Sequence, residues 1–234
     1  MPTSLGRFTT FAGYGRMRQP AGGSGPSGTL RVIMLGDANR GTLITNLNTA
    51  KNTLGYTGVT LTWTSTDINN YTGTGLTTAN YDVAVVYTNG GALPAGGGGT
   101  ALNNYIASGG TVVFASFCWG NVPAIPNFTY TNNPYAFNGN SASGFVPTLT
   151  VIGTHPITTG IGTTLGTSVF RSSNITLQGT ATNLGWYPDG TTSMIAVQTG
   201  PRRVGLNFYP PSGLTSNGYQ LMVKSIVWAG GLLN

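Results

Sequence analysis

Short apolar runs, most of them closed by a turn signal, dominate the first half of the chain. They are 30–35 (LRVIML), 59–63 (VTLTW), 82–87 (DVAVVY) and 111–117 (TVVFASF). Continuous apolar runs of this length are typical of buried strands. The run at 59–63 alternates apolar and polar residues, which also predicts a strand.

Two segments between these runs have the spacing of amphipathic helices. The first carries its apolar stripe at Leu43, Leu47, Ala50 and Leu54, and either Asp37 or Asn39 can cap its start. The second is 100–107, which Gly109-Gly110 ends. The resulting order of strands and helices predicts a parallel sheet with helices on both faces and right-handed crossovers.

The second half of the chain is less regular. Residues 121–147 form a long segment rich in Asn, Pro and aromatic residues. Segments 194–197 and 203–208 flank Gly200-Pro201 and predict a hairpin. Asn217 is expected to cap a final surface helix, with Gln220 and Lys224 on its polar face.

The first 29 residues differ from the rest and are predicted to form a basic, Gly-rich arm outside an α/β domain at 30–234. The segment is rich in Gly, Ser and Pro, and it lacks the apolar core of a secretory signal. It is either a flexible tail or an arm that orders on a neighbouring subunit, with nucleic-acid binding as a minor alternative. The arm residues expected to contact a partner are Arg7, Phe8, Phe11, Tyr14, Arg16 and Arg18.

Composition excludes several kinds of chemistry. Charged residues are 6% of the 234, against about 25% in a typical domain, yet the net charge is +6. The four acidic residues are all Asp, so no mechanism can depend on Glu. One Cys and one His cannot supply the usual zinc set or an internal disulfide, and neither a metal nor a cofactor is predicted. No apolar run is long enough to span a membrane.

Four phrases in order resemble the class I glutamine amidotransferase-like superfamily, and within it the ThuA-like (trehalose-utilisation) branch. They are NYDVAVVY (80–87), ASGGTVVFASFCWGN (107–121), THPITTGI (154–161), and RRVGLNFYP (202–210) paired with a helix ending IVWAGG (226–231). The resemblance covers roughly residues 30–231. It implies a flavodoxin-like three-layer sandwich with a mostly parallel sheet, followed by a C-terminal β-hairpin and helix. The arm and the insertion at about 121–147 lie outside it.

The resemblance also places Cys118 on the turn that carries the reactive residue of the superfamily. Such a thiol needs a base or a positive neighbour. His155 is the only His, and it lies in a turn phrase. ThuA-like proteins often end the last strand with Gly-His, whereas the corresponding place in this chain reads Leu206-Asn207-Phe208-Tyr209, without a His. Cys118 and His155 are therefore catalytic candidates only if the protein is an enzyme, and the domain resembles a degenerate member.

A surface of Thr, Asn, Ser and Gly suits permanent packing against other subunits. We therefore expect a non-catalytic structural protein of a virion, such as a minor capsid, decoration or tail-associated subunit, made without a signal peptide. Its expected partners are other protein subunits, bound through the arm, and not a membrane or nucleic acid. A docking loop is predicted at Phe128, Tyr130, Tyr135 and Phe137, although this loop could instead fold over its own sheet edge.

Two alternatives remain from the sequence. A cytoplasmic carbohydrate-binding or carbohydrate-processing ThuA-like protein would bind a glycan, with Trp119, Trp186 and Tyr187 as stacking platforms. A Cys118-dependent hydrolase or amidotransferase would use the thiol as its nucleophile.

Overall fold

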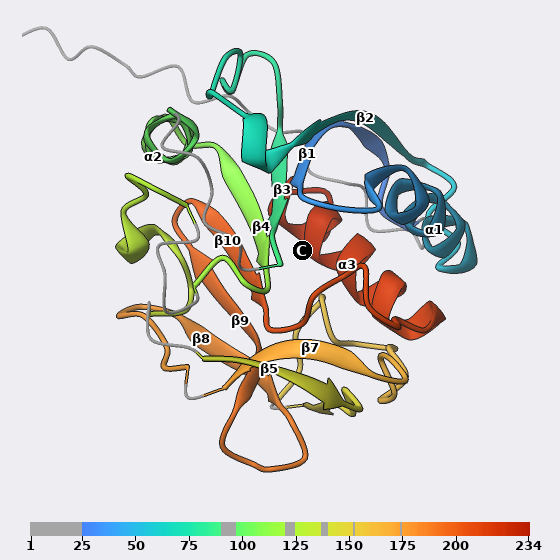
Figure 1. Cartoon of the computed structure of the whole chain (residues 1–234). Helices are drawn as coiled ribbons and strands as arrows, with labels where there is room; N and C mark the ends of the chain where they lie inside the picture. Colours follow the sequence, from blue (N-terminus) through green and yellow to red (C-terminus); the bar gives the residue numbers. More distant parts are fainter. Residues whose placement is uncertain (1–24, 90–96, 120–124, 137–139, 152, 174) are drawn as a thin grey trace, which may run out of the picture.

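The computed structural model describes residues 25–89, 97–119, 125–136, 140–151, 153–173 and 175–234 (Figure 1). An eight-stranded sheet has the order β2-β1-β3-β4-β10-β9-β8-β6. Its parallel part consists of β1 (Gly28–Gly36), β2 (Val59–Asp67), β3 (Val83–Tyr87), β4 (Thr111–Ala115) and β10 (Arg202–Leu206). Antiparallel pairing then adds β9 (Ser193–Thr199), β8 (Thr182–Trp186) and β6 (Thr150–Val151).

Three helices and a small second sheet complete the described part of the chain. The helices are α1 (Arg40–Thr53), α2 (Gly98–Ala107) and α3 (Ser216–Ala229), with single 3-10 turns at Ile68–Asn70 and Tyr130–Asn132. The second sheet pairs β5 (Asn140–Phe145) with β7 (Val169–Ser173). No helix among the described residues is long and apolar enough to cross a membrane.

The parallel strands are buried on both faces, so successive residues enter two different cores. In β1, Val32 and Met34 face the core that also contains residues of α1 and α3. Ile33 and Leu35 face the core formed with α2. The three layers confirm the predicted α/β, flavodoxin-like sandwich, and the predicted hairpin is the antiparallel pair β9–β10.

The final helix is not the surface helix that the sequence predicts. Every residue of α3 from Leu221 to Ala229 is buried, including Lys224, whose Nζ donates to the Thr159 carbonyl. Residues 155–165, which precede β7, pack against the side of α3 that the sequence predicts to face solvent. The cap also differs: Thr215 is the N-cap, and the Asn217 side chain donates instead to the Thr164 carbonyl.

Two aromatic residues of the predicted docking loop are core residues. Phe128 and Tyr135 are both buried in the α2-side cluster, where Phe128 packs on Phe114 and Tyr135 packs on Trp119. Their rings therefore cannot anchor a partner, and this part of the loop covers its own sheet. Phe137, the Tyr130 side chain and the six predicted arm residues (Arg7, Phe8, Phe11, Tyr14, Arg16, Arg18) lie outside the described part of the structure.

Candidate functional site at the carboxyl end of the sheet

Four parallel strands bring their carboxyl ends to one edge of the sheet, where open α/β folds bind ligands. Asp37 follows β1, and Thr88 and Asn89 follow β3. Cys118 lies on the turn after β4, and Asn207 follows β10. These residues therefore lie at the same edge of the sheet. Their hydrogen bonds and burial determine whether any of them is available for catalysis or ligand binding.

Cys118 is completely buried. Its Sγ donates to the Val86 carbonyl at 3.4 Å, and its own N–H donates to the Ala115 carbonyl at 3.2 Å. Burial raises the pKa of the thiol well above its ordinary value, because a thiolate would lose its solvation. The side chain is thus a neutral thiol held by a backbone carbonyl.

His155 lies at the other end and on the other face of the sheet. Its ring packs edge-on against Trp228 of α3, with centroids 5.2 Å apart, and its Nδ1 accepts from the Ile157 N–H at 3.2 Å. Burial, together with the positive charge of Arg202 at the amino end of β10, lowers its pKa. Cys118 belongs to the opposite, α2-side core. The structure therefore does not bring the two catalytic candidates together.

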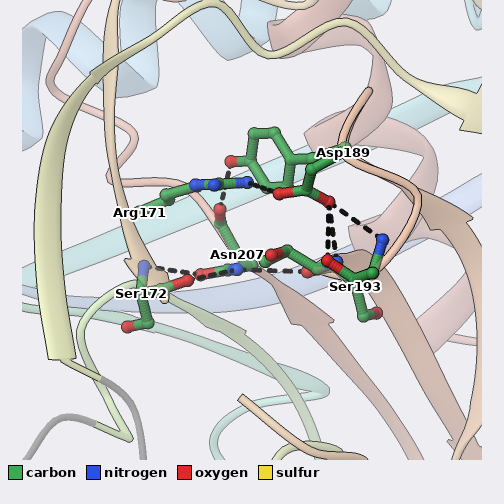
Figure 2. A network of polar contacts seen from close by, with 8 residues as sticks. Arg171, Ser172, Asp189, Ser193 and Asn207 are labelled. Atoms are coloured by element: carbon green, nitrogen blue, oxygen red, sulfur yellow. Dashed lines mark hydrogen bonds and ion pairs between the residues drawn. The ribbon is translucent and has the colours of Figure 1, made fainter. Parts of the chain in front are cut away.

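Asn207 lies in the stretch 206–209, where the resemblance would put a histidine, and its side chain makes four hydrogen bonds (Figure 2). Its Oδ1 accepts from the Ser172 N–H at 2.9 Å and from the Ser116 hydroxyl at 3.1 Å. Its Nδ2 donates to the carbonyls of Ser172 and Ser193 at 2.9 and 3.1 Å. Asn207 therefore ties β7, β9 and the Cys118 turn together.

Asp37 closes the edge between β1 and β3, where the strand order reverses direction. Its carboxylate accepts the Tyr209 hydroxyl at 2.9 Å and the Asn89 N–H. Burial, followed by the hydrogen bond to Asp37 and the charge of that carboxylate, raises the pKa of Tyr209, so this hydroxyl stays a donor. Asp37 does not cap α1, whose N-cap is Asn39 in a left-handed conformation without a side-chain bond.

The sequence does not predict an ion pair that lies beside the site, between the buried Arg171 and the partly exposed Asp189. The Arg171 guanidinium lies 3.8 Å and 4.3 Å from the ring centroids of Phe145 and Tyr187. It also binds the Asp189 carboxylate at 2.9 Å (Figure 2). Asp189 lies in the turn Pro188-Asp189-Gly190, and its Oδ1 also accepts the Thr191 and Thr192 N–H groups. Because Arg171 and Asp189 are distant in sequence and neither lies in a motif, no local signal marks the pair.

Burial alone would raise the pKa of Asp189, but the hydrogen bonds from Thr192, Thr191 and Arg171 outweigh it. The pKa is therefore far below its ordinary value. Within the described ranges, no three His, Cys, Asp or Glu side chains lie close enough to hold a metal ion.

Comparison with known proteins identifies the fold. No protein-family model and no curated protein sequence matches the chain. A solved ThuA-like protein from Parabacteroides merdae ATCC 43184 matches with a TM-score of 0.56 at 13% identity, covering 88% of this chain and 92% of that one. A second ThuA-like protein, from Bacteroides uniformis ATCC 8492, gives a TM-score of 0.47 at 14% identity, over 91% and 95% of the two chains. The first of these two matches shows that the chain has a ThuA-like fold.

Proposed function

We propose that this chain is a non-catalytic structural protein, a degenerate amidotransferase-like domain that serves as a subunit of a larger protein assembly. The observation that carries this proposal is the state of Cys118. A nucleophilic thiol must be exposed to substrate and must ionise near neutral pH. This thiol is fully enclosed, hydrogen-bonded to Val86, and has a raised pKa.

The surroundings of Cys118 support the same proposal. A base at the end of β10 would need a free ring or carboxylate directed at the thiol. The side chain at that place is Asn207, and its amide makes four hydrogen bonds to neighbouring strands and turns. These bonds hold neighbouring segments together. We therefore infer that the carboxyl end of the sheet, where a catalytic site would lie, instead connects the main sheet to β7.

The assembly part of the proposal draws on the surface. Because only 6% of its residues are charged, this chain would have few charges to desolvate when it packs against a partner subunit. The particular form we favour is a virion component held through the residues before β1.

Testing this requires fractionation of native particles on a density gradient. The chain should sediment with the particle after a high-salt wash, and a chain found only as a free monomer would refute the assembly role.

A carbohydrate-binding role has less support. Of the three aromatic residues that could stack on a sugar, Trp119 and Tyr187 are buried, and Trp186 is partly exposed. The sugar alternative thus depends on the ThuA-like resemblance. Binding to a glycan array that is lost in Trp186→Ala would favour it over the structural role.

The non-catalytic proposal predicts that Cys118 will not react while the protein is folded. With iodoacetamide at pH 7.5, we expect labelling to be at least about 100-fold slower than for an exposed thiol, because both access and ionisation are blocked. The matched control is Thr163→Cys, which places a thiol at an exposed position of the same chain. Both thiols should label equally fast in 6 M guanidinium chloride. Fast native labelling of Cys118 would instead support the hydrolase alternative.

A further inference from the structure

The outer edge of β2 is long, regular and uncharged over most of its length. Its nine residues pair with β1 without a bulge, and residues 59–66 contain no charged side chain and no proline. Asp67, at the far end, is paired with Arg40. Natural proteins usually protect sheet edges with charges, prolines, bulges or short strands. The opposite edge of this sheet follows that rule, because β6 is only two residues long.

The backbone register shows which groups face outward. The Gly28 N–H donates to the Gly58 carbonyl, so the even-numbered residues of β2 direct their backbone groups at β1. Leu61, Trp63 and Ser65 consequently direct their N–H and C=O groups away from the sheet. Within the described residues, nothing hydrogen-bonds these outward groups. Figure 1 shows β2 as the outermost strand, beyond β1.

We propose that this edge pairs with the β2 edge of a second copy of the chain. The two strands run antiparallel about a two-fold axis at Trp63, so one sheet continues through both copies. In this register Trp63 lies opposite Trp63 of the second copy, and Leu61 lies opposite Ser65. These are the hydrogen-bonded positions of an antiparallel ladder, so all the outward groups of the three residues find a partner.

The side chains of the strand are complementary to themselves in the same register. One face carries only threonines, with Thr62 opposite Thr64 and Thr60 opposite Thr66, and Thr–Thr pairs stabilise antiparallel strands. Three of these four are exposed in the single chain. On the other face, Trp63 is partly buried and its Nε1 donates to Asn48 of α1 at 3.1 Å. In this register the threonines of one copy pair with those of the other, and no like charges lie opposite each other. For these reasons we infer that the occupant of the edge is a second copy of the chain.

Charge substitution tests the interface in the full chain. We expect light scattering after gel filtration to give the mass of a dimer for the unchanged protein, and of a monomer for Thr62→Lys/Thr64→Lys and for Thr62→Asp/Thr64→Asp. A one-to-one mixture of the two variants should form dimers again, because position 62 of one copy opposes position 64 of the other. The control Thr163→Lys/Thr180→Lys adds the same charge at exposed positions elsewhere and should remain dimeric.

Two results would overturn the proposal. One is a monomeric unchanged protein at about 100 μM, well above the micromolar range in which a specific homodimer forms. The other is a lysine variant that folds, by circular dichroism, and stays dimeric, since another surface would then join the copies.

Cross-linking tests the register. Thr62→Cys/Thr64→Cys should form disulfide dimers on oxidation, because 62 and 64 are directly opposite at a non-hydrogen-bonded pair, about 4.5 Å apart at Cα. Thr60→Cys/Thr64→Cys should not, because these positions are not opposite each other. Cys118 is buried and adds no background. This inference does not require the domain to be non-catalytic: a dimer with a reactive Cys118 would refute the proposed function alone.

Discussion

At the scale of single residues, the Asn207 side chain joins separate segments of the chain at the carboxyl end of the sheet. Its side chain has two acceptor and two donor sites, and all four are used by Ser116, Ser172 and Ser193. It is completely buried, so none of these bonds competes with bulk water. The residue therefore fixes the Cys118 turn relative to β7 and β9.

Replacing Asn207 by Asp should destabilise the fold strongly. A carboxylate of the same shape would face the Ser172 and Ser193 carbonyls in place of the amide donors. Leaving both carbonyls without a donor should lower the free energy of unfolding by about 3 kcal/mol or more. Urea denaturation measures this, with the exposed Asn52→Asp as the control, expected within about 0.5 kcal/mol of the unchanged protein. Equal stability of the two variants would mean that the network contributes little.

At the scale of elements, α3 is a central helix enclosed by α1, the sheet and the segment before β7. The spacing of its apolar residues predicts the helix correctly. The same apolar stripe would occur in a helix that packs on one layer and in a helix that is enclosed on all sides, so the spacing does not distinguish the two. Lys224 reveals the difference, because burial lowers its pKa and its ammonium reaches one carbonyl, that of Thr159. A surface lysine would show neither property.

Lys224→Met should therefore leave the fold intact and stabilise it at neutral pH by about 1 kcal/mol, since an apolar chain of similar length removes the cost of burying a charge. The Thr159 carbonyl can be hydrated instead, because Thr159 is exposed. A lysine with a lowered folded pKa weakens the fold while it is protonated, so the difference should shrink as the pH rises towards 10.5. Thermal melts at pH 7 and pH 10 measure it. Lys224→Ala, which leaves a cavity, should be less stable than Lys224→Met.

At the scale of the whole molecule, four aspartates and one histidine are nearly all that can titrate between pH 2 and pH 8. The pKa values of His155 and Asp189 are both lowered, which favours the neutral form of the histidine and the charged form of the aspartate. His155 is held neutral by burial and by Arg202, whereas Asp189 is held ionised by its hydrogen bonds. The dependence of stability on pH should therefore be simple enough to assign residue by residue.

We expect the free energy of unfolding to fall in two stages on acidification. The lowered pKa of His155 costs stability as the pH falls below about 6.5, because the unfolded chain binds the proton more readily. The lowered pKa of Asp189 contributes stability that is present above about pH 4 and is lost below it. Urea denaturation from pH 3 to 8 should show that His155→Gln removes the upper stage.

Asp189→Asn should flatten the lower stage. It should also cost about 1–2 kcal/mol at pH 7, less than for a fully buried pair because Asp189 is about a third exposed to solvent. An unchanged lower stage in this variant would assign it to the other aspartates.

Much of the sheet could be predicted because its signals are local. Strands β1, β3 and β4 are continuous apolar runs, and Gly200-Pro201 marks the β9–β10 hairpin. By contrast, β6, β8 and the β5–β7 pair have short, polar sequences that become strands only when a partner supplies hydrogen bonds. The sequence also predicted β2 only to Trp63, because its last four residues lack apolar positions.

The sequence by itself determined the order of the α/β elements, the place of Cys118 on the turn after β4, and the shortage of groups that could activate it. Only the tertiary structure decided that Cys118 is enclosed, that His155 lies across the sheet from it, that Asn207 joins β7 to the site, and that Phe128 and Tyr135 are core residues. The physical reason is that hydrophobic periodicity and turn residues act over a few positions, whereas burial and side-chain hydrogen bonds depend on which distant segments the topology brings together.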